Sequence, residues 1–418
     1  MSRTQQTKQK IPVERLTKGL YVDLQLSWSE HPFLFSKFKI VSDQQIAAIR
    51  QLGLTEVTVL IDQCDVQFDY QSQEEEAPDL NAADALWKDK NEHLVQARQY
   101  RQRRAEVVQR YRNKAAMANK LVRDLKSYPA NAIRDMDDIV VELVQDFEHQ
   151  GDLFTNLVNL GGGAHSIYNH SVNVTILSLM LGAALDLRGD ELRQLAIGAL
   201  LHDVGKIELP SQIVNKTAPR TQAEEHIFQR HTLLGRKLTE RVRTLPESIL
   251  DVIANHHEHL DGSGYLRQLK GREISTFTRI VSIANLYDNL CNPPNPSQSM
   301  APKTALAVIY TKFNAKVDHA LVAQFIRRIG VYPPGTVVRL TDGSIGLVVT
   351  VDPADLLHPE LLLYNPDIPK EEALIISLKD HPDLAIQEAL AKQDYPSRIF
   401  QYLGIEERIG YFVETRPA

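Results

Sequence analysis

The residues best suited to chemistry stand at the end of an apolar run. Residues 195–201 have the sequence LAIGALL, and His202 and Asp203 follow at once, with Lys206 three residues later. A charged or strongly polar pair at the end of an apolar helix costs free energy unless it is paired or bound to a cation. The pair is therefore a candidate for metal binding, although a helix end with His and Asp on its solvated side would give the same pattern.

Histidines gather around this pair. Eight of the fourteen histidines lie between His165 and His259, where an even spread would place about three. Singly, each is more typical of a structural residue, but together with nearby carboxylates they favour a metal site. Imidazole and carboxylate ligands suit Fe, Mn or Zn better than Ca or Mg alone. The candidates are His170, His202, Asp203, His231, His256, His257, Asn285 and Asp288.

The adjacent His-Asp and His-His pairs predict how such a site would be arranged. One carboxylate can bridge two ions while imidazoles occupy the outer positions. Two ions held in this way lower the pKa of a shared water and hold the phosphate oxygens during in-line attack. The pattern is thus the one that a two-metal phosphohydrolase needs.

Helices are expected to position these residues. Residues 130–330 are predicted to be all-helical, with capping and breaking residues between the helices. The first predicted helix covers 165–187, and the second is capped by Asp190 and leads into His202. The third begins with a Thr221–Glu224 capping box, and the fourth begins at Pro246 and carries 249–257. The last two cover 276–290 and 318–329, the latter closed by Gly330.

The segment before the helices is expected to be a small mixed α/β domain over residues 1–80. It contains no pattern of likely catalytic residues, which favours a structural or regulatory role. Strand-like runs cover 11–26, 33–40 and 55–61, and a helix covers 43–52, with Asp43 as a possible N-cap and Gly53 at its end.

A linker region is expected over residues 81–135. An acidic, polar stretch at 71–90 leads into a long amphipathic helix at 87–125. This helix could join two chains as a dimer or signalling helix, or lie on its own domain, and the sequence favours neither.

After Pro333-Pro334-Gly335 the pattern changes to a β-rich extension, residues 333–418. A hairpin is predicted from 336–340 and 345–349 with a turn at Asp342-Gly343, and a further strand covers 373–378. Together with the helical centre at 136–332, the fold class is mainly α, with a small mixed domain before the bundle and a β-rich appendage after it.

Composition excludes several classes of function. The formal net charge is −6, which argues against binding a nucleic acid polymer. No apolar run approaches the roughly 20 residues that span a bilayer, and no secretory signal is visible, so a soluble cytoplasmic protein is expected. Cys64 and Cys291 are the only cysteines. They form no disulfide framework, so a metal site must be built from His, Asp and Glu.

Residues 145–330 resemble the HD-GYP phosphodiesterases of the HD phosphohydrolase superfamily. The resemblance rests on HS at His170, HDVGK at 202–206, the isolated His231, HHEHLDGSGY at 256–265 and ANLYDNL at 284–290. Residues 11–140 also look like the domain of unknown function that often precedes this type in bacteria. The resemblance implies an all-α bundle and a site with two or three Fe or Mn ions. It also implies hydrolysis of cyclic di-GMP to linear pGpG, with further cleavage to GMP left open.

The resemblance also implies roles for single residues. His202 and Asp203 would be ligands, Asp203 bridging the ions, and His231, His256 and His257 would complete one metal position. Lys206 would place an ammonium on a substrate phosphate. The residues implied to border the substrate are Asp261, Gly262, Gly264 and Tyr265, whose loop could otherwise be a simple turn.

Four positions depart from the family pattern. The proline after Tyr265 is Leu266, and the third-ion Glu is replaced by Ser166, so two divalent ions are expected rather than three. Asn285 stands where a carboxylate ligand is expected, while Asp288 keeps the second acid of that motif. An amide is a weaker, neutral ligand. The Arg-Pro-Tyr segment is replaced by CNPPNPSQ at 291–298, and Lys303 and Arg279 are the nearest basic substitutes in sequence.

Three functions follow as alternatives. The first, favoured because the His-Asp core is whole, is a cyclic di-GMP phosphodiesterase. The second is a degenerate member that binds a cyclic dinucleotide, or a partner such as a diguanylate cyclase, without turnover. The third is a phosphohydrolase for another nucleotide.

Overall fold

A computed structural model describes residues 8–65, 82–128, 132, 135–145, 167–241, 245–295, 298–352, 354–390 and 394–404. The chain forms two compact units. One comprises Met1–Arg101 with Asn365–Ile375, and the other Gln102–Tyr364 with Ile376–Ala418. The four-part division expected from the sequence is finer than this and stays a prediction. Residues His165 and Ser166, in the first predicted helix of the bundle, lie outside the described residues.

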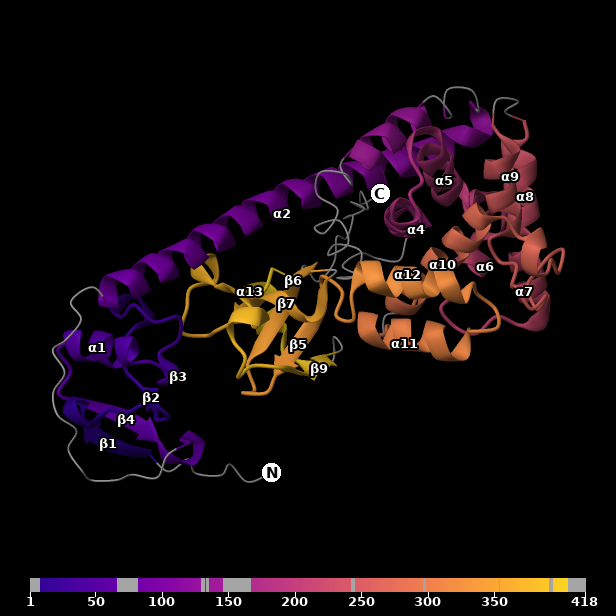
Figure 1. Ribbon diagram of the computed structural model, residues 1–418. Coiled ribbons are helices and arrows are strands. Elements are labelled where there is room, and N and C mark those ends of the chain that lie inside the picture. The colour runs from indigo at the N-terminus through magenta and orange to yellow at the C-terminus, as the bar shows by residue number, and fades with distance from the viewer. Residues whose placement is uncertain are drawn as a thin grey trace, which may run out of the picture. The chain divides into compact units, whose positions relative to one another are not determined.

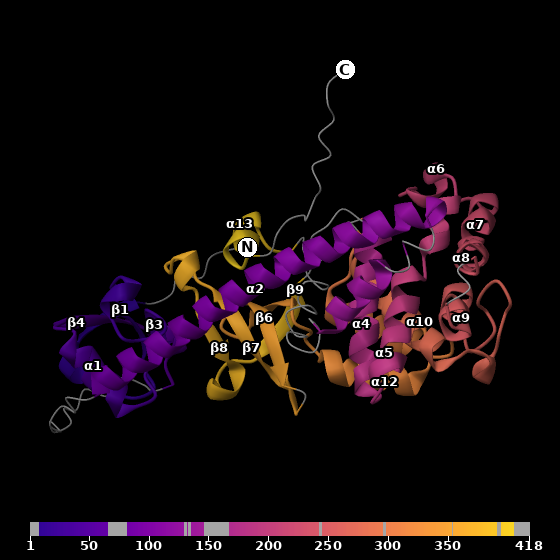
Figure 2. The same cartoon turned by 90° about the horizontal axis from the view of Figure 1, so that it is seen from above.

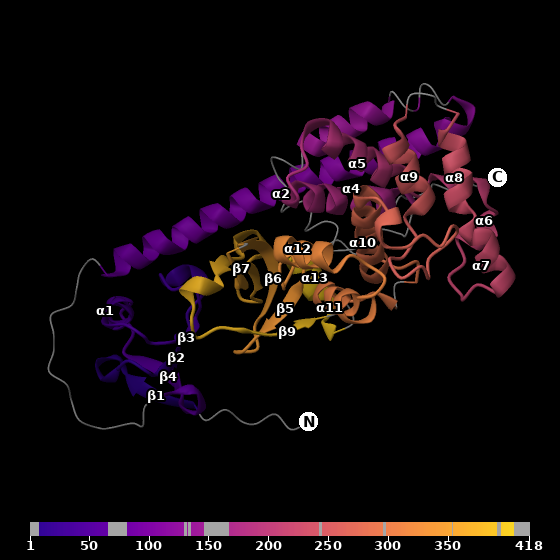
Figure 3. The ribbon, with the colours of Figure 1, turned by 45° about the vertical axis from the view of Figure 1, so that its right-hand side comes forward.

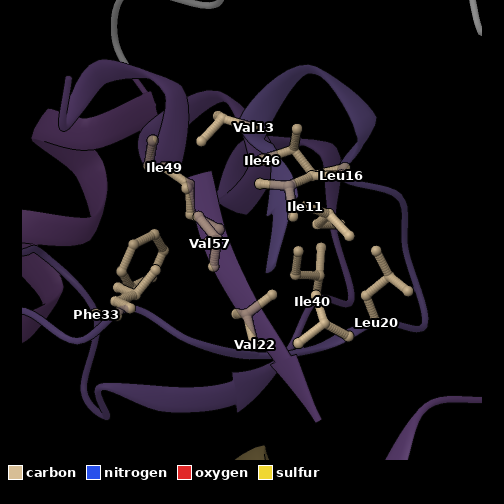
Figure 4. Close-up of a cluster of buried hydrophobic side chains, with 13 residues drawn as sticks. Ile11, Val13, Leu16, Leu20, Val22, Phe33, Ile40, Ile46, Ile49 and Val57 are labelled. Carbon is tan, nitrogen blue, oxygen red and sulfur yellow. The ribbon is translucent and has the colours of Figure 1, made fainter. Parts of the chain in front are cut away.

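The N-terminal sheet has strand order β1-β4-β2-β3, with antiparallel neighbours. Its strands are β1 (Lys8–Pro12), β2 (Tyr21–Asp23), β3 (Lys37–Lys39) and β4 (Glu56–Leu60), and α1 (Asp43–Gln51) belongs to the same unit. Side chains from the strands and from α1 form one apolar core, in which Val22, Ile40 and Ile49 are fully buried (Figure 4). This core explains the strand-like runs of the sequence, since alternate residues point into it.

The predicted cap of α1 was one residue late. Ser42, not Asp43, is the N-cap: its side chain accepts a hydrogen bond from the backbone N–H of Gln45. The Gln45 side chain accepts one from the Ser42 N–H in return. This reciprocal pair satisfies two free donors at the helix start, which a lone Asp43 would not. Gly53 ends the helix region with a φ of +72°, as the sequence predicted.

Helix α2 (Ala82–Ser127) is 46 residues long and contains the whole predicted range of 87–125 (Figure 1). Its residues up to Arg101 belong to the first unit and the rest to the second. Several of the apolar positions that define its amphipathic face are buried within the single chain, namely Tyr100, Val107, Tyr111, Leu121 and Leu125. Because this face is buried within one chain, the structure favours a helix that packs on its own domain over a helix that pairs with a second chain.

The helical centre is built around α4, which packs against α5, α10 and α12, while α9 packs against α5 and α8 (Figure 2). α4 is buried along almost its whole described length, and it carries polar side chains such as His170 and Asn173 into the interior. The helices are α4 (Ile167–Ala184), α5 (Gly189–Leu201), α6 (Ser211–Val214), α7 (Gln222–Gln229), α8 (His231–Thr239), α9 (Glu247–Asn255), α10 (Thr276–Cys291), α11 (Pro302–Lys312) and α12 (His319–Ile329), with the short 3-10 helix η4 (Val204–Glu208) after α5.

Most predicted helix ends in this part are confirmed. Thr221 and Glu224 form the capping box of α7, Asp318 caps α12, and Gly330 ends α12 with a φ of +88°. The cap predicted for α5 was wrong. Arg188 is the N-cap, and the Asp190 carboxylate accepts hydrogen bonds from the side chains of Arg193 and Gln194 instead of from the helix N–H groups. Asp190 therefore lies inside the first turn, where its charge still suits the helix dipole.

The C-terminal sheet has strand order β8-β7-β6-β5-β9, and Figure 3 labels its strands β5, β6, β7 and β9. Its strands are β5 (Val337–Leu340), β6 (Ile345–Asp352), β7 (Asp355–Tyr364), β8 (Ile375–Ser377) and β9 (Ile386–Leu390), and helix α13 (Ser397–Tyr402) follows. The predicted hairpin is confirmed, because β5 and β6 pair antiparallel on either side of Asp342-Gly343. The fold class is mainly α with two small antiparallel sheets, as predicted. Among the described residues, none of the helices combines the length and apolar character that crossing a membrane requires.

Two glycines bring the central pair of residues close to its neighbours. Gly205 in η4 meets Gly235 in α8, and a side-chain carbon on Gly205 would overlap the carbonyl oxygen of His231. Only glycine fits this crossing. The close approach therefore sets Asp203, just before η4, beside His231 at the start of α8.

Candidate metal centre

Asp203 lies at the centre of the site. It follows His202, the C-cap of α5, and its side chain is 1% exposed. Its two carboxylate oxygens face two different groups of histidines. Two groups of side chains have potential ligand atoms within 4.8 Å of one another. The first group consists of Asp203, His231, His256 and His257, and the second consists of His170, His202 and Asp203.

The first group surrounds Oδ1 of Asp203. Nε2 of His231 lies 3.3 Å from this oxygen, and Nε2 of His256 lies 3.7 Å from it. His256 is the C-cap of α9, and the partly exposed His257 follows it. The start of α8 and the end of α9 thus bring two imidazoles to one carboxylate oxygen, and His257 belongs to the same group of ligand atoms.

The second group surrounds Oδ2. Nε2 of His202 lies 3.4 Å from this oxygen and Nε2 of His170, from α4, lies 3.6 Å from it. The ammonium of Lys206 also contacts Oδ2. One carboxylate therefore has an oxygen for each histidine group, with a lysine beside the second.

Backbone carbonyls fix which ring nitrogen carries the proton. Nδ1 of His202 lies 2.7 Å from the Ala199 carbonyl oxygen, and Nδ1 of His231 lies 2.7 Å from that of Phe228. Nδ1 of His256 lies 3.1 Å from the carbonyl oxygen of Ile253. A carbonyl oxygen can only accept, so each Nδ1–H donates and each neutral ring presents a bare Nε2 to Asp203.

These bare nitrogens face one another across short distances. Nε2 of His231 lies 3.3 Å from Nε2 of His256, and Nε2 of His202 lies 3.3 Å from Nε2 of His170. Oδ1 of Asp203 has no hydrogen-bond partner although it is buried. Lone pairs that converge without a proton repel unless a cation lies between them. The set of imidazoles and one carboxylate thus fits a divalent transition metal.

Burial keeps the histidines in the neutral, ligating form. It lowers the pKa of His202, His231 and His257, and it lowers the pKa of His256 to about 4. Burial alone would raise the pKa of Asp203, but the nearby positive charge of Lys206 holds the pKa of this carboxyl well below its usual range. Asp203 is therefore ionised while its histidine partners are neutral.

His170 is held from behind by a second carboxylate. Its Nδ1–H donates to Oδ2 of Asp288 over 2.6 Å, and its Nε2 lies 3.0 Å from Oδ1 of Asn285. Asn289 donates to the same amide oxygen over 2.6 Å, which turns that oxygen toward His170. Asn285 thus presents an acceptor on the side of the metal-ligand atoms, whereas Asp288 lies on the other side of the His170 ring.

The loop 261–265 has one end at the histidines and the other in solvent. The Tyr265 ring stacks on His257, with centroids 4.8 Å apart and an interplanar angle of 24°. Gly264 is buried, and a side chain there would overlap the backbone of Glu258 and His259. Asp261 is exposed and accepts from the backbone N–H of Ser263. Gly262 packs beside the Lys270 side chain. Of the four predicted loop residues, only Gly264 and Tyr265 lie against the histidine segment.

Sequence reasoning missed the residue that anchors this loop. Glu258 is 2% exposed. Its carboxylate accepts hydrogen bonds from the backbone N–H groups of Arg267, Gln268 and Leu269. An acidic residue inside the HHEH run, between a helix end and a glycine loop, was the signal that could have found it.

Neither predicted substitute for the absent arginine faces the site. Arg279 pairs with Asp318 over 3.0 Å and donates to the Gly271 and Ile274 carbonyls. Lys303 donates to the Tyr332 hydroxyl over 2.9 Å.

A different arginine, missed from the sequence, lies nearer to the histidines. The guanidinium of Arg220 lies 3.6 Å from the centroid of the Phe228 ring. Lys206 Nζ lies 5.1 Å from the same centroid, and the ring packs against His231 with centroids 5.2 Å apart. One aromatic ring therefore borders a histidine of the first group and two cations.

Comparisons with known proteins give two family matches. Residues 154–321 match the family model described as HD domain, and residues 8–136 match a domain of unknown function. The part of the chain at 154–321 is therefore similar to HD domains. The resemblance drawn from its motifs, including the preceding domain, is confirmed, and HD domains form a metal-dependent family.

Curated relatives of this HD domain include named phosphodiesterases. A cyclic di-GMP phosphodiesterase of Pseudomonas aeruginosa is 26% identical over 85% of this chain and 84% of its own length. One of Borreliella burgdorferi is 28% identical over 44% of this chain and 48% of its own length. A 3'3'-cGAMP-specific phosphodiesterase of Vibrio cholerae is 27% identical over 49% of this chain and 43% of its own length.

The buried histidines predict that the metal-free protein loses stability in mild acid. An unfolded histidine takes up a proton near pH 6.5, whereas folded His256 does so only at about pH 4. Between these values the unfolded state binds more protons, so the free energy of unfolding falls as the pH falls. Urea denaturation with a chelator present should give a slope of up to about 1.4 kcal/mol per pH unit for each such proton.

The variant His256→Gln provides the control for this slope. It removes one of the protons that the unfolded state gains, so its unfolding free energy should depend less steeply on pH between 6.5 and 4. A wild-type slope equal to that of the variant would contradict the assignment of His256 as neutral and buried.

Proposed function

We propose that this chain is a metal-dependent phosphodiesterase that hydrolyses cyclic di-GMP to linear pGpG. The comparisons support a hydrolase, and the names of the relatives support this substrate. The observation that carries the proposal is the single carboxylate of Asp203, which turns one oxygen to each of two groups of bare imidazole nitrogens. A centre of this kind matches two divalent ions, with Fe or Mn as the proposed metals.

The residues divide between two proposed ion positions. His231, His256 and His257 with Asp203 would hold one ion, and His170 and His202 with Asp203 would hold the other. Asn285 adds a neutral oxygen to the second position, which makes that position the weaker one. The bound ions supply a low-pKa water and hold the phosphate oxygens. Asp288 acts in this proposal by orienting His170.

Two cations of the chain suit a phosphodiester substrate. Lys206 contacts Asp203 and borders Phe228, so its ammonium is within reach of a phosphate next to the carboxylate. Arg220 borders the same ring, and its planar guanidinium can hold a phosphate by two hydrogen bonds. A cyclic dinucleotide carries two phosphates, and we assign Lys206 to the one that is cleaved and Arg220 to the other.

The loop is proposed to border the substrate through Tyr265. Its ring stacks on His257 and so stands at the rim of the first histidine group. Glu258 holds the segment after the loop, and Gly264 lets the backbone pass close to Glu258 and His259. Asp261 and Gly262 would shape the outer part of the loop.

One observation favours a second substrate. Relatives of Vibrio cholerae are named as specific for 3'3'-cGAMP, so this cyclic dinucleotide is the competing substrate. The expectations of a diguanylate cyclase partner and of a homodimer through 87–125 remain proposals, and burial of the apolar face of α2 within one chain argues against the homodimer.

The test is turnover by protein prepared without oxygen and loaded with Fe, with Mn or with no metal. Each sample receives cyclic di-GMP or 3'3'-cGAMP, and the products are separated by chromatography. We expect metal-dependent formation of pGpG, faster than cleavage of 3'3'-cGAMP. The double variant His202→Ala/Asp203→Ala should lose activity by a factor on the order of 1,000 or more, because it removes a ligand and the shared carboxylate.

Three results would contradict the proposal in different ways. Faster cleavage of 3'3'-cGAMP would change the substrate. Tight binding of cyclic di-GMP without turnover in metal-loaded protein would make the chain a receptor. Equal turnover by the wild type and the double variant would show that the activity comes from elsewhere.

Arg220 gives a separate prediction. Arg220→Gln should raise KM for cyclic di-GMP about 10-fold and change kcat little, because a contact to the uncleaved phosphate contributes equally to the substrate and the transition state. Arg220→Lys, which keeps the charge but loses the planar fork, should be intermediate. Steady-state kinetics on metal-loaded protein measures both constants.

Arg193→Gln serves as the matched control, because Arg193 forms surface ion pairs with Asp137 and Asp190. It removes the same charge and should leave KM unchanged. If Arg220→Gln and Arg193→Gln behave alike, Arg220 does not bind the substrate.

A further inference from the structure

A buried chain of hydrogen bonds connects α2 to the metal centre. The Tyr111 hydroxyl on α2 donates to Oδ1 of Asn173 over 2.7 Å. The amide nitrogen of Asn173, on α4, donates to Oδ1 of Asp288 over 2.9 Å. The other oxygen of Asp288 accepts from Nδ1–H of His170 over 2.6 Å. None of the four side chains is more than 7% exposed.

The donor and the acceptor of each hydrogen bond in this chain are fixed. Asp288 is a carboxylate that accepts on both oxygens, from His170 on one side and from Asn173 and Asn292 on the other. Asn173 must therefore turn its NH₂ group toward Asp288, which leaves its carbonyl oxygen to accept from Tyr111. Burial raises the pKa of Tyr111 above its ordinary value, so the phenol keeps the proton that it donates. Phenylalanine at position 111 would leave the Asn173 oxygen buried without this donor.

We propose that Tyr111 and Asn173 are positioning residues for His170, so that α2 fixes the geometry of the second ion position. The proposal rests on the proposed role of His170 as a ligand in the metal-dependent site. Residues that orient a ligating histidine from behind set its tautomer and its direction. Asp288 has this place directly, and Tyr111 and Asn173 hold Asp288 in turn.

Because Tyr111 lies on α2, a displacement of this helix would affect the orientation of His170. α2 is one continuous helix whose first part, up to Arg101, belongs to the other compact unit. An α-helix rises 1.5 Å per residue and transmits a displacement along its axis. A hydrogen bond weakens strongly once its donor and acceptor move apart by a few tenths of an ångström beyond about 3.2 Å. A small axial shift of α2 would therefore break the Tyr111 contact and release the chain that ends at His170.

The first test compares Tyr111→Phe with the wild type, with Mn²⁺ as the probe. Calorimetry should show two ions per chain in both proteins, with the weaker ion bound on the order of 5-fold less tightly by the variant. This is less than the 10- to 100-fold that the loss of a direct partner of a ligand causes. kcat for cyclic di-GMP should fall by a similar factor while KM stays the same, because the loss lies at the metal and not at the substrate contacts.

Tyr128→Phe is the matched control. Tyr128 follows the end of α2 and is 64% exposed, so loss of its hydroxyl should alter neither Mn²⁺ affinity nor kcat. Thermal unfolding of both variants without metal separates a general loss of stability from an effect on the ion. Unchanged affinity for the weaker ion in Tyr111→Phe would overturn the proposal, whatever its thermal stability.

A double-mutant cycle tests whether Tyr111 acts through Asn173. Asn173→Ala removes both the acceptor for Tyr111 and the donor to Asp288, so it should weaken the second ion more than Tyr111→Phe does. In the Asn173→Ala background, the change at Tyr111 should have no further effect on Mn²⁺ affinity. Additive losses in the double variant would show that Tyr111 acts by another route and would overturn the proposed chain.

A readout without metal keeps this inference distinct from the proposed function. Nitrogen-15 NMR of the metal-free protein should show a protonated Nδ1 on His170, protected from exchange with water, and faster exchange of that proton in Tyr111→Phe. Identical exchange in the two proteins would contradict the positioning role. Normal Mn²⁺ binding and the expected exchange without any turnover would instead contradict the phosphodiesterase alone.

Discussion

The arrangement of the site depends on one buried carboxylate whose two oxygens have different surroundings. Asp203 is almost wholly enclosed, and an ionised carboxylate in such a place is costly unless cations or hydrogen-bond donors surround it. The backbone carbonyls of Ala199, Phe228 and Ile253 accept hydrogen bonds from the Nδ1–H groups of three neighbouring histidines. These histidines consequently turn acceptors toward the carboxylate. Lys206 contacts only one of the two carboxylate oxygens, and the histidine and aspartate cluster could hold a metal ion.

The helices around Asp203 exist in their present order because they must bring histidines to it from distant parts of the sequence. α4 supplies His170, the end of α5 supplies His202, and the ends of α8 and α9 supply the others. These histidines thus lie near helix ends, and the C-cap residues His202 and His256 each donate to a carbonyl in the last turn of their own helix. Gly205 and Gly235 permit the closest of these crossings. A side chain at Gly205 would overlap the carbonyl oxygen of His231 and force η4 away from α8, whereas the contacts at Gly235 are looser.

The sequence predicted those helix caps and turns that depend on residues close together in the chain. The Thr221–Glu224 box, the Asp318 cap and the Asp342-Gly343 turn each involve residues within a few positions of one another. The candidate ligands were also predictable, because His-Asp and His-His pairs have few other uses. What could not be predicted was which polar side chains meet across the fold. Arg279 and Lys303 are near the absent arginine in sequence, but their partners are Asp318 and Tyr332.

The same limit applies to the residues behind the ligands. Nothing in the pattern of α2 marks Tyr111 as different from its other buried apolar neighbours, because the hydroxyl finds Asn173 only after α2 and α4 have packed. Arg220 and Glu258 are further examples, since their contacts depend on how α7 and the glycine loop fold back toward the histidines. Asp43 and Asp190 failed as caps for a smaller reason: a neighbouring residue had the better geometry at the helix start.

The central claim is that Asp203 joins two ion positions, and electron paramagnetic resonance of the protein loaded with Mn²⁺ tests it most directly. Two Mn²⁺ ions that share a carboxylate are magnetically coupled, so the account predicts two ions per chain and the broadened, multiline spectrum of a coupled pair. Asp203→Asn should lose that spectrum. Two ions with the simple six-line signal of isolated Mn²⁺, or one ion per chain at saturation, would contradict the account.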